Sequence, residues 1–544
     1  KITLFFLSAL IGIFLFAEAS LAVWVPPIGI PVPPFPSDLD VARPNPPSPW
    51  TSEIAGNYYI DRSSGGCSDS RAYVTPSASR CTLPTSPAAG SKIYVNGTYS
   101  AGGTISWAGT SANPIWLTYY DNANRPLFTG VSPNPLYFNG NYIIVDGIRS
   151  DLGGATNDQV GMYGNNLMIR DSTFRNTYGG SGGTGLDTAG SNLVFYKGTV
   201  YDQGNWQYVG ADIDRLGFKV SPPTNGLWIL DSQIYHVQGD GVQVGDQNNT
   251  SAQVNRVFIG RNTLYENLQS CLWTKNATDV IFSQNVCYNI TAPGSNAGDG
   301  QGLGGQYDPI RVWFLANTIH DTQVGIKMSG SSSGGGGPWY AIGNVLYNII
   351  SSNGCNAWGM GALSYRNEGG FYGYFNTIYN ADSFIAVVPS NSGAFRNNIF
   401  SHQYTTTGCP ALNDDGYGTY SLDYNLWDTA TPTLKYDGTT YSSLAAFSSA
   451  TGQETHRVVG NPLLTSPPTN MNISSSSPAK DVANPTEETV FAAFQTRYGV
   501  DIRKDFAGST RPNGTRWDIG AYEYVSGAPI DTTPPSAPSG LSVS

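Results

Sequence analysis

The stretch from Gly260 to Tyr347 repeats one six-residue pattern four times: GRNTLY (260–265), SQNVCY (283–288), LANTIH (315–320) and IGNVLY (342–347). Further copies lie on both sides of it: IRDSTF (169–174), ILDSQIY (229–235), YFNTIY (374–379) and FRNNIF (395–400). With Asp146, Gly198 and Asn425 included, the marked Asn, Asp or Gly positions stand 21–33 residues apart. A repeat of this length with one polar anchor per unit is typical of a solenoid.

The pattern inside each unit is that of β-strands. In VFIGRNTLY (257–265) and VIFSQNVCY (280–288), apolar and polar residues alternate, and β-branched and aromatic residues dominate. No apolar period near 3.6 is sustained between residues 50 and 525. A unit of about 28 residues accommodates three short strands with turns, which is one rung of a parallel β-helix. We therefore predict an all-β, right-handed parallel β-helix of about eleven rungs over residues 141–430, capped at both ends.

The repeated asparagine has a structural explanation in such a fold. Rungs stack at about 4.8 Å, so equivalent positions lie above one another. An Asn at a bend can bond its own backbone and the Asn of the next rung. We expect Asn285, Asn317 and Asn344 to be buried at one bend in such a ladder.

Composition and the first residues indicate the compartment. Charged residues make up 12% of the chain and the formal net charge is −11, which argues against nucleic acid as a partner. Lys1 precedes an uncharged run, and residues 1–22 are predicted to be a signal peptide. A retained membrane anchor is the alternative, although residues 2–17 are short for a span. We expect a secreted or cell-surface monomer without stable membrane insertion after signal removal.

The cysteines are consistent with an oxidising destination. Their even number, six, is compatible with three disulfides, but the sequence leaves all 15 pairings open. There is no CxxC motif or histidine cluster, which disfavours a zinc or haem site.

The chain divides into six predicted segments. The prediction reads: 1–22 signal peptide, 23–49 proline-rich linker, 50–140 N-terminal cap and first coils, 141–430 rungs, 431–526 closing segment, and 527–544 linker with the start of a truncated fibronectin type III-like module. The linker is expected to space the domain from a membrane or wall. EETVFAAFQTRYG (487–499) is helix-like.

Residues for binding or chemistry must project outward, because the inside of a β-helix is filled by side chains. If Val242 and Val244 point inward, period 2 turns Gln243 outward. Aligning equivalent strands gives the outward column Asp187, Lys219, Gln243, Trp273 and Lys327. A second column, two residues on, is Ala189, Ser221, Gly245, Lys275 and Ser329.

Three segments carry a resemblance to a known superfamily. YYIDRSSGGCSDS (58–70), GTSANPIWLTYYDNANRP (109–126) and KDFAGSTRPNGTRWDIGAYEY (504–524) resemble the opening and closing parts of secreted right-handed β-helix proteins of the pectate lyase superfamily. With the rungs, the resemblance covers nearly all of residues 55–525. It implies the fold more than the function, because that superfamily contains lyases, hydrolases and non-catalytic adhesins.

One rung is similar to that of family nine polysaccharide lyases. SCLWTKNATDVIFSQN (270–285) resembles the rung in which those enzymes carry a lysine as Brønsted base, and the match implies Lys275. One rung earlier those enzymes have calcium-binding carboxylates of the type DDGFD. Here the run is GDGVQ (239–243), so Asp240 matches one acid, while Gly239 and Gln243 replace two others. The resemblance therefore implies a calcium ion with Asp240 as one ligand, although the set of matching carboxylates is incomplete.

The first functional hypothesis is a secreted lyase that cleaves an acidic, uronate-containing polysaccharide by β-elimination. A lysine removes the proton at C5 while calcium or a cationic side chain neutralises the adjacent carboxylate. Lys219, Gln243, Trp273 and Lys327 are then expected to bind substrate around one groove with Lys275 and Asp240. The ordinary alternatives are a solvated Lys275 and a turn residue at Asp240.

Two other hypotheses stay open. A non-catalytic glycan-binding or cell-surface solenoid is the second, because the metal run is incomplete. A glycoside hydrolase is the third, with Asp187, Asp212 and Asp214 as its possible acids.

Overall fold

The computed structural model describes residues 24–526 apart from 64, 72, 100–102, 130–135, 152–159, 177–182, 209–213, 291–299, 331–335, 352–353, 355–359, 368 and 417. The predicted signal peptide (1–22) and the predicted fibronectin-like start (527–544) lie outside these residues.

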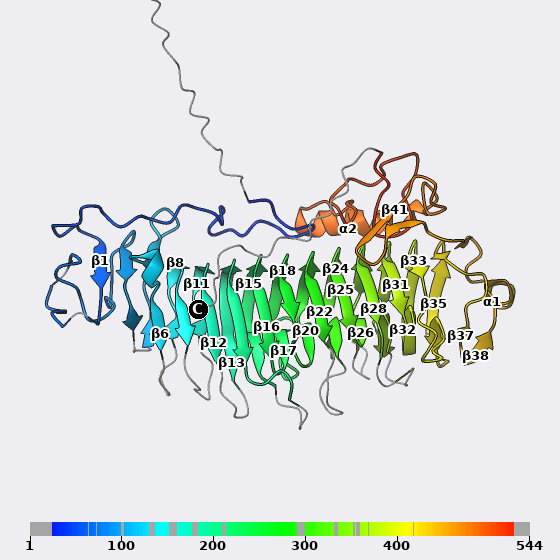
Figure 1. The fold of residues 1–544 in the computed structure, drawn as a ribbon, viewed down its shortest axis with the longest axis horizontal. Helices are drawn as coiled ribbons and strands as arrows, with labels where there is room; N and C mark the ends of the chain where they lie inside the picture. Colours follow the sequence, from blue (N-terminus) through cyan, green and yellow to red (C-terminus); the bar gives the residue numbers. More distant parts are fainter. Residues whose placement is uncertain are drawn as a thin grey trace, which may run out of the picture.

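The described chain winds into a long stack of parallel strands (Figure 1). One rung shows the course: β17 (Asp240–Val244), β18 (Val254–Gly260) and β19 (Thr263–Tyr265) lead to β20 (Ser270–Lys275), which pairs with β17 in parallel. The next strands, β21 (Thr278–Ser283) and β22 (Val286–Ile290), pair in the same way with β18 and β19. The predicted parallel β-helix, also implied by the superfamily resemblance, is confirmed.

The strands form three faces. The first face consists of β4 (Gly103–Ile105), β7 (Leu136–Phe138), β10 (Val160–Met162), β13 (Thr184–Tyr196), β15 (Leu216–Leu230), β17, β20, β23 (Gln301–Gln306), β26 (Val324–Ser329), β29 (Leu363–Asn367), β32 (Ile385–Arg396), β34 (Leu412–Asp414) and β37 (Leu434–Tyr436). The second face consists of β1 (Asn57–Ile60), β2 (Lys92–Val95), β5 (Ile115–Tyr119), β8 (Asn141–Asp146), β11 (Asn165–Arg170), β13, β15, β18, β21, β24 (Ile310–Leu315), β27 (Trp339–Ile342), β30 (Phe371–Tyr374), β32 and β35 (Gly418–Asp423). The long strands β13, β15 and β32 take part in both faces.

The third face is a separate sheet of 14 described strands. It consists of β3 (Thr98–Tyr99), β6 (Leu127–Thr129), β9 (Arg149–Asp151), β12 (Thr173–Asn176), β14 (Thr199–Gln203), β16 (Gln233–Val237), β19, β22, β25 (Thr318–Thr322), β28 (Val345–Ile349), β31 (Thr377–Ala381), β33 (Ile399–Ser401), β36 (Leu426–Trp427) and β39 (Val458–Val459). The remaining elements are η1 (Asn122–Asn124), β38 (Thr439–Tyr441), α1 (Leu444–Thr451), β40 (Leu464–Ser466), β41 (Asn470–Ile473), η2 (Pro485–Glu487) and α2 (Glu488–Tyr498).

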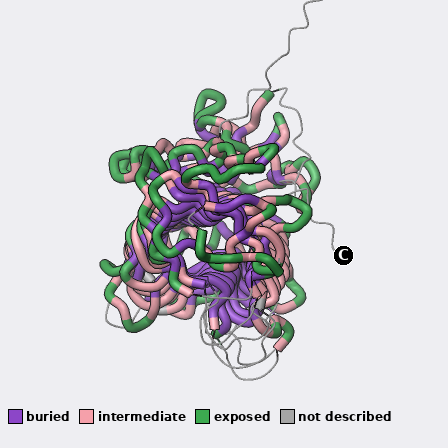
Figure 2. The backbone as a smooth tube through the Cα atoms, turned by 90° about the vertical axis from the view of Figure 1, so that its left-hand side faces the viewer, coloured by how far each residue is buried: buried purple, intermediate pink, exposed green. Residues whose placement is uncertain are grey.

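The coil fills the predicted rung segment and extends beyond both of its ends. Eleven strands of the second face, from β8 to β35, fall within residues 141–430. Before them, β1, β2 and β5 already stack in parallel onto β8, so residues 50–140 contribute the first coils. The inside of the coil is apolar, and Figure 2 shows the buried segments gathered along its axis.

An asparagine ladder runs inside the bend between the second and third faces. Asn317 Nδ2 donates to the Phe282 carbonyl at 2.9 Å and to Asn344 Oδ1 at 3.0 Å. Asn317 Oδ1 accepts from the Asn285 backbone N–H at 3.0 Å. All three asparagines are fully buried, so the predicted ladder is confirmed. Its members are Asn262, Asn285, Asn317, Asn344, Asn376, Asn398 and Asn425.

The ladder differs from the sequence alignment at four anchors. Asp146 still belongs to β8, and the bend position of its rung is Ile148, whose backbone N–H donates to Ser172 Oγ. Asn398 is the ladder residue, and Asn397 lies one position before it with a φ of 58°. Asp171 and Asp231 likewise precede Ser172 and Ser232 and also have positive φ. Asp171 and Asp231 therefore mark the sharp turn, while the next residue carries the bend's interior hydrogen bonds.

A carboxyl group ends the ladder. Asn425 Nδ2 donates to Glu454 Oε1 at 2.7 Å, and Trp427 Nε1 donates to the same oxygen at 3.0 Å. Burial raises the pKa of Glu454 to about 7, against the opposing effect of these two donors.

The second face is covered along much of its length. Residues 24–49, here called the strap, run along this face (Figure 1). Gly29 lies beside α2, and from there the strap returns along the face toward the N-terminal coils, where the Asn45 carbonyl accepts from Tyr94 Oη. Ile30, Phe35 and Leu39 of the strap are buried, and Trp228 Nε1 donates to the Pro31 carbonyl at 2.8 Å. The described residues 24–49 of the predicted proline-rich linker (23–49) therefore pack on the coil, because their apolar side chains cover an apolar sheet face.

Helix α2 covers the same face from the C-terminal side. Phe491 and Phe494 are buried against it, and Arg497 and Tyr498 bond Asp279 of β21. The predicted helix at 487–499 is confirmed, with α2 at Glu488–Tyr498. Gly499 adopts a positive φ of 73° and ends it.

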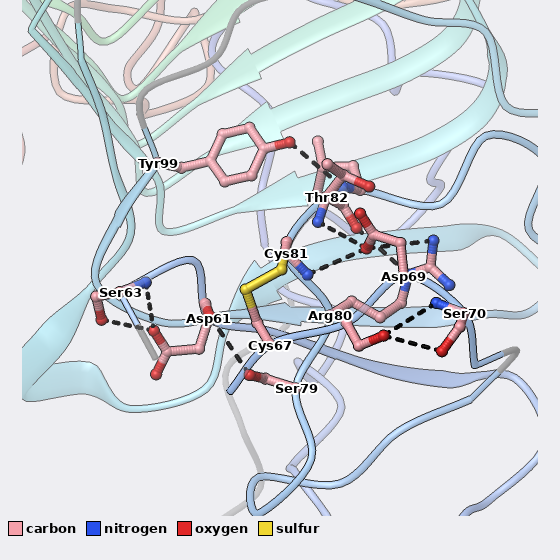
Figure 3. Close-up of a disulfide and its surroundings, with 12 residues drawn as sticks. Asp61, Ser63, Cys67, Asp69, Ser70, Ser79, Arg80, Cys81, Thr82 and Tyr99 are labelled. Carbon is pink, nitrogen blue, oxygen red and sulfur yellow. Dashed lines mark hydrogen bonds and ion pairs between the residues drawn. A yellow bond between two sulfur atoms is a disulfide. The ribbon is translucent and has the colours of Figure 1, made fainter. Parts of the chain in front are cut away.

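Two disulfides can be assigned. Cys67 pairs with Cys81 in the first coils (Figure 3), and Cys271 of β20 pairs with Cys287 of β22 inside the coil. Cys409 is also disulfide-bonded, and Cys355 lies outside the described residues. Over the part of the chain that the structure describes, no helix has the length and apolar character needed to cross a membrane.

Candidate functional site

The predicted outward column lies on the first face. Strand register places Asp187 beside Lys219, Lys219 beside Gln243, and Gln243 beside Trp273. One rung was missed, because Gly304 of β23 lies between Trp273 and Lys327. Because Gly304 of the strand QGLGGQ (301–306) has no side chain, its outward direction could not be predicted from the sequence.

Alternation along the strands turns these residues outward. Val242 and Val244 are fully buried in the core of the coil, so Gln243 between them faces away from it. Leu272 occupies the same core, which turns Trp273 outward.

Lys275 is held by a contact with the preceding rung. It ends β20, and its Nζ donates to Gln243 Oε1 at 2.8 Å. Gln243 Nε2 in turn donates to the Gly245 carbonyl at 3.2 Å. Gly245 has a φ of 77°, and a Cβ there would lie 2.0 Å from the Lys275 carbonyl oxygen. Glycine at 245 thus permits the close stacking that brings Lys275 over Gln243.

A second ammonium group lies on the other side of Gln243. Lys219 is its register partner, and Lys219 Nζ is 3.9 Å from Asp246 Oδ2. Both side chains are about one-third exposed. Lys219 is therefore accessible to solvent and only loosely neutralised by Asp246.

Asp187, one rung before Lys219, is held by two hydrogen bonds. Its two carboxylate oxygens accept from Tyr163 Oη at 2.9 Å and Ser221 Oγ at 2.6 Å. Asp187 is 8% exposed. Of the other two acids considered for hydrolysis, Asp214 is exposed in the segment before β15, and Asp212 lies outside the described residues.

Trp273 and Lys327 are placed in the column but are not open. Each is 5% exposed. The Trp273 ring lies over Gly304, where a Cβ would be 2.5 Å from it. Trp273 consequently presents little ring surface for stacking on a sugar.

Asp240 lies at the opposite end of the strand from Lys275. It is the first residue of β17, is 3% exposed, and accepts from Ser270 Oγ at 2.6 Å. Its register partner Ser270 is five residues before Lys275, which is a distance of about 16 Å along a strand. The structure does not bring Asp240 and Lys275 together.

The residues on the first face do not fit the calcium site that the resemblance implied. Calcium takes six to eight oxygen ligands, usually with several carboxylates. The described part of the chain contains no group of three or more His, Cys, Asp or Glu side chains suited to a metal ion. The GDGVQ run offers one carboxylate, that of Asp240, and it is hydrogen bonded to Ser270.

The structure adds two residues to the cluster that the sequence did not single out. Asp246 follows the strand in a loop, and Tyr163 follows β10 (Val160–Met162). Neither position belongs to a strand of the repeat, so period-2 alternation could not assign its direction. The run GDQNNTS (245–251) is rich in turn residues, which indicates a loop but not the direction of the Asp246 side chain.

Comparison with known proteins gives structural likeness alone. No protein-family model matches the chain, and no curated protein matches it. Among solved structures, pectate lyase Pel9A is 12% identical with a TM-score of 0.42, covering 86% of this chain and 96% of that chain. The GH136 lacto-N-biosidase from Eubacterium ramulus is 12% identical with a TM-score of 0.44, covering 68% and 67%. The PL6 family alginate lyase AlyGC is 13% identical with a TM-score of 0.40, covering 68% and 54%. The parallel β-helix follows from the strand pairing itself, and the activities in these names belong to those proteins.

Proposed function

We propose that this protein is a secreted polysaccharide lyase that cleaves an acidic, uronate-containing polysaccharide by β-elimination, with Lys275 as the base. The observation that carries the proposal is the arrangement of two lysines around Gln243 on the first face. Lys275 Nζ is 2.8 Å from Gln243 Oε1, and Lys219 is the register partner of Gln243 on the other side.

The two lysines have different roles in the proposed reaction. The ammonium group of Lys219 neutralises the uronate carboxylate and so makes the C5 proton more acidic. Lys275, in its neutral form, takes that proton. The C5–H electron pair becomes the C4–C5 double bond, the C4–O bond breaks, and the leaving oxygen takes a proton from solvent. The products are a new chain end and an unsaturated uronate.

Gln243 is a positioning residue in this scheme. Its side-chain carbonyl accepts from Lys275 Nζ, while its own amide is fixed on the Gly245 carbonyl. Because Gln243 is 4% exposed, its orientation is set by the protein and not by solvent. It would hold the Lys275 amine at one place above the strand.

The proposed reaction relies on lysine charge. The carboxylates of the described residues do not form the calcium set of the DDGFD type, so no step is assigned to a metal ion. Asp240 is left outside the reacting cluster because of its position at the start of β17.

Secretion is supported by two observations. The apolar run at residues 2–17 follows a single lysine, as in a signal peptide. The disulfides Cys67–Cys81 and Cys271–Cys287 are of a kind that persists in oxidising compartments.

A non-catalytic glycan-binding solenoid is the second candidate. The incomplete GDGVQ run favours it, because Asp240 is the one carboxylate of that run and is hydrogen bonded to Ser270. Such a protein would bind polyuronates and release no product.

The test is a comparison of single-lysine variants. The protein is incubated with polygalacturonate, alginate and related uronate polymers, and the unsaturated product is followed by near-ultraviolet absorbance. Lys275→Ala should lower the rate by about 100-fold or more, as expected for loss of a general base. Lys504→Ala, in the closing segment, is the matched control and should leave the rate unchanged. An unchanged rate in Lys275→Ala would refute the mechanism, and binding without product in the parent protein would favour the second candidate.

A further inference from the structure

Two tyrosines continue the first face beyond Asp187. Tyr137 of β7 is the register partner of Gly161 in β10, and Tyr163 follows β10 directly. Their ring centroids are 5.3 Å apart with the planes tilted by 49°. Both rings are partly exposed.

Gly161 allows both rings to lie against the sheet. A Cβ at Gly161 would be 2.2 Å from the Tyr163 ring and 2.5 Å from the Tyr137 ring. The outward space above Gly161 is therefore filled by aromatic carbon, close to the backbone. The two rings form a low aromatic surface, which we call the tyrosine platform (Tyr137 and Tyr163).

The platform is tied to the lysine cluster. Tyr163 Oη donates to Asp187, and Asp187 is the register partner of Lys219. Gly161, Asp187, Lys219 and Gln243 occupy four successive rungs of one column. The platform is thus three rungs, or about 14 Å, from the residue that holds Lys275.

The platform differs from the other outward aromatics. On the third face, Tyr265 and Tyr288 stack at 5.1 Å with planes within 9°, and His320 stacks on Tyr288 at 5.0 Å. Those rings cover one another's faces and leave edges to solvent. Trp273 is 5% exposed. The tilted, partly exposed tyrosines above Gly161 are better suited to contact a flat ligand from outside.

Sugar rings have the chemistry that this surface can recognise. Their axial C–H groups pack on aromatic faces, and their hydroxyls donate to carboxylates. Asp187 accepts from Tyr163 and Ser221, and a carboxylate has further lone pairs for a sugar hydroxyl. A second carboxylate at this place would be repelled by Asp187.

We propose that Tyr137, Tyr163 and Asp187 form a subsite for an uncharged sugar residue of the same polysaccharide whose uronate lies at Lys219 and Lys275. The identity of the bound chain rests on the proposed function. The subsite itself predicts that the substrate is a mixed polymer of uronate and neutral sugars, bound along the solenoid axis.

Binding in an inactive background separates this proposal from the lyase reaction. In Lys275→Ala, affinity is measured by titration calorimetry for a polymer of alternating uronate and neutral sugars and for polygalacturonate. Adding Tyr163→Ala should weaken binding of the mixed polymer by about three- to tenfold, as expected for loss of an aromatic contact. Binding of polygalacturonate should change less. Tyr424→Ala, at the distant bend between β35 and β36 where the Tyr424 ring stacks on His456, is the control and should change neither affinity.

A second variant distinguishes loss of the aromatic contact from loss of folding. Tyr163→Phe keeps the ring and removes the bond to Asp187, so it should retain more affinity than Tyr163→Ala. Equal affinity of Tyr163→Ala and its parent for the mixed polymer would overturn the subsite, as would equal weakening in Tyr424→Ala. If the parent protein gives no unsaturated product but Tyr163→Ala weakens binding, the lyase proposal fails and the subsite stands.

Discussion

The first and second faces of the coil are built from the same parallel strands, but their outward side chains have opposite character. On the second face the outward residues are apolar, and the strap and α2 cover them: Met168, Val194, Trp228, Phe258, Ile281 and Trp313. On the first face the corresponding column begins Asp187, Lys219 and Gln243. Interior packing allows both faces to form. The polarity of the outward side chains decides which face is covered by other segments and which is left for a ligand.

The cover of the second face is made by two segments that meet. Gly29 of the strap has a φ of 77°, and a Cβ there would be 2.5 Å from Leu315 and 3.0 Å from Phe494. Residues far apart in sequence thereby close over one apolar stripe. The first face has no comparable apolar stripe among its described outward residues between Asp187 and Gln243.

The largest effect is expected where the cover meets the sheet. Phe494 is 1% exposed and packs edge-on against Trp313 at 4.8 Å. Phe494→Ala should lower the free energy of unfolding by about 3–5 kcal/mol, because it leaves a cavity in a packed apolar layer. Urea denaturation measures it. A loss below about 1 kcal/mol would mean that the cover is not part of the stable structure.

A pH-dependent effect is expected at the end of the ladder. The pKa of Glu454 is about 7 in the folded protein against an ordinary value of 4.5, because the group is fully buried. Its contribution is complete below about pH 4.5 and is lost as the pH rises through about 7. Glu454→Gln should remove that loss, which is about 3 kcal/mol at pH 8.

Denaturation of the parent and Glu454→Gln at pH 5 and pH 8 separates this group from others. The variant should gain relative stability between the two pH values. A constant difference between the proteins would show that Glu454 does not titrate in this range.

The ladder itself should contribute a moderate amount. Asn317→Leu removes the donor to the Phe282 carbonyl and the acceptor of the Asn285 N–H. The expected loss is about 1–3 kcal/mol, the cost of leaving buried polar groups without partners. Asn122→Leu, at an exposed turn, is the control. Equal unfolding midpoints for the two variants would contradict a structural ladder.

The smallest effect on stability is expected on the first face. Lys219 is one-third exposed and its nearest acid, Asp246, is 3.9 Å away. Lys219→Ala should change the free energy of unfolding by less than about 0.5 kcal/mol. It should nevertheless weaken polyuronate binding. A large loss of stability would show that Lys219 has a structural role and would contradict its assignment to ligand binding.

The sequence was sufficient for the fold because interior constraints repeat. The Asn at one bend and the alternation around Val242 and Val244 follow from stacking, and both were predicted. The strap was not, because its prolines resemble a spacer while burial of Ile30 and Phe35 depends on a distant sheet face. The rung of Gly304 was missed because glycine has no side chain, so the alternation of inward and outward side chains cannot be recognised at that position.

The candidate site was predictable in part. Period 2 placed Lys219 and Gln243 on one column, and the resemblance pointed to Lys275. The position of Asp240 could not be predicted from alternation, since its distance from Lys275 depends on where each strand begins. The solvent exposure of each side chain could not be predicted from the sequence either. Trp273 lies in the column but is buried by its neighbours.

The proposed elimination on the first face is identified most directly by its products. Proton NMR of digests of uronate-containing polymers should show the vinylic signal of a 4,5-unsaturated uronate at each new chain end. Neutral polysaccharides, as the control, should give no such signal. New reducing ends without the vinylic signal would indicate hydrolysis and contradict the account, and intact polymer after prolonged incubation would contradict any catalytic role for Lys275.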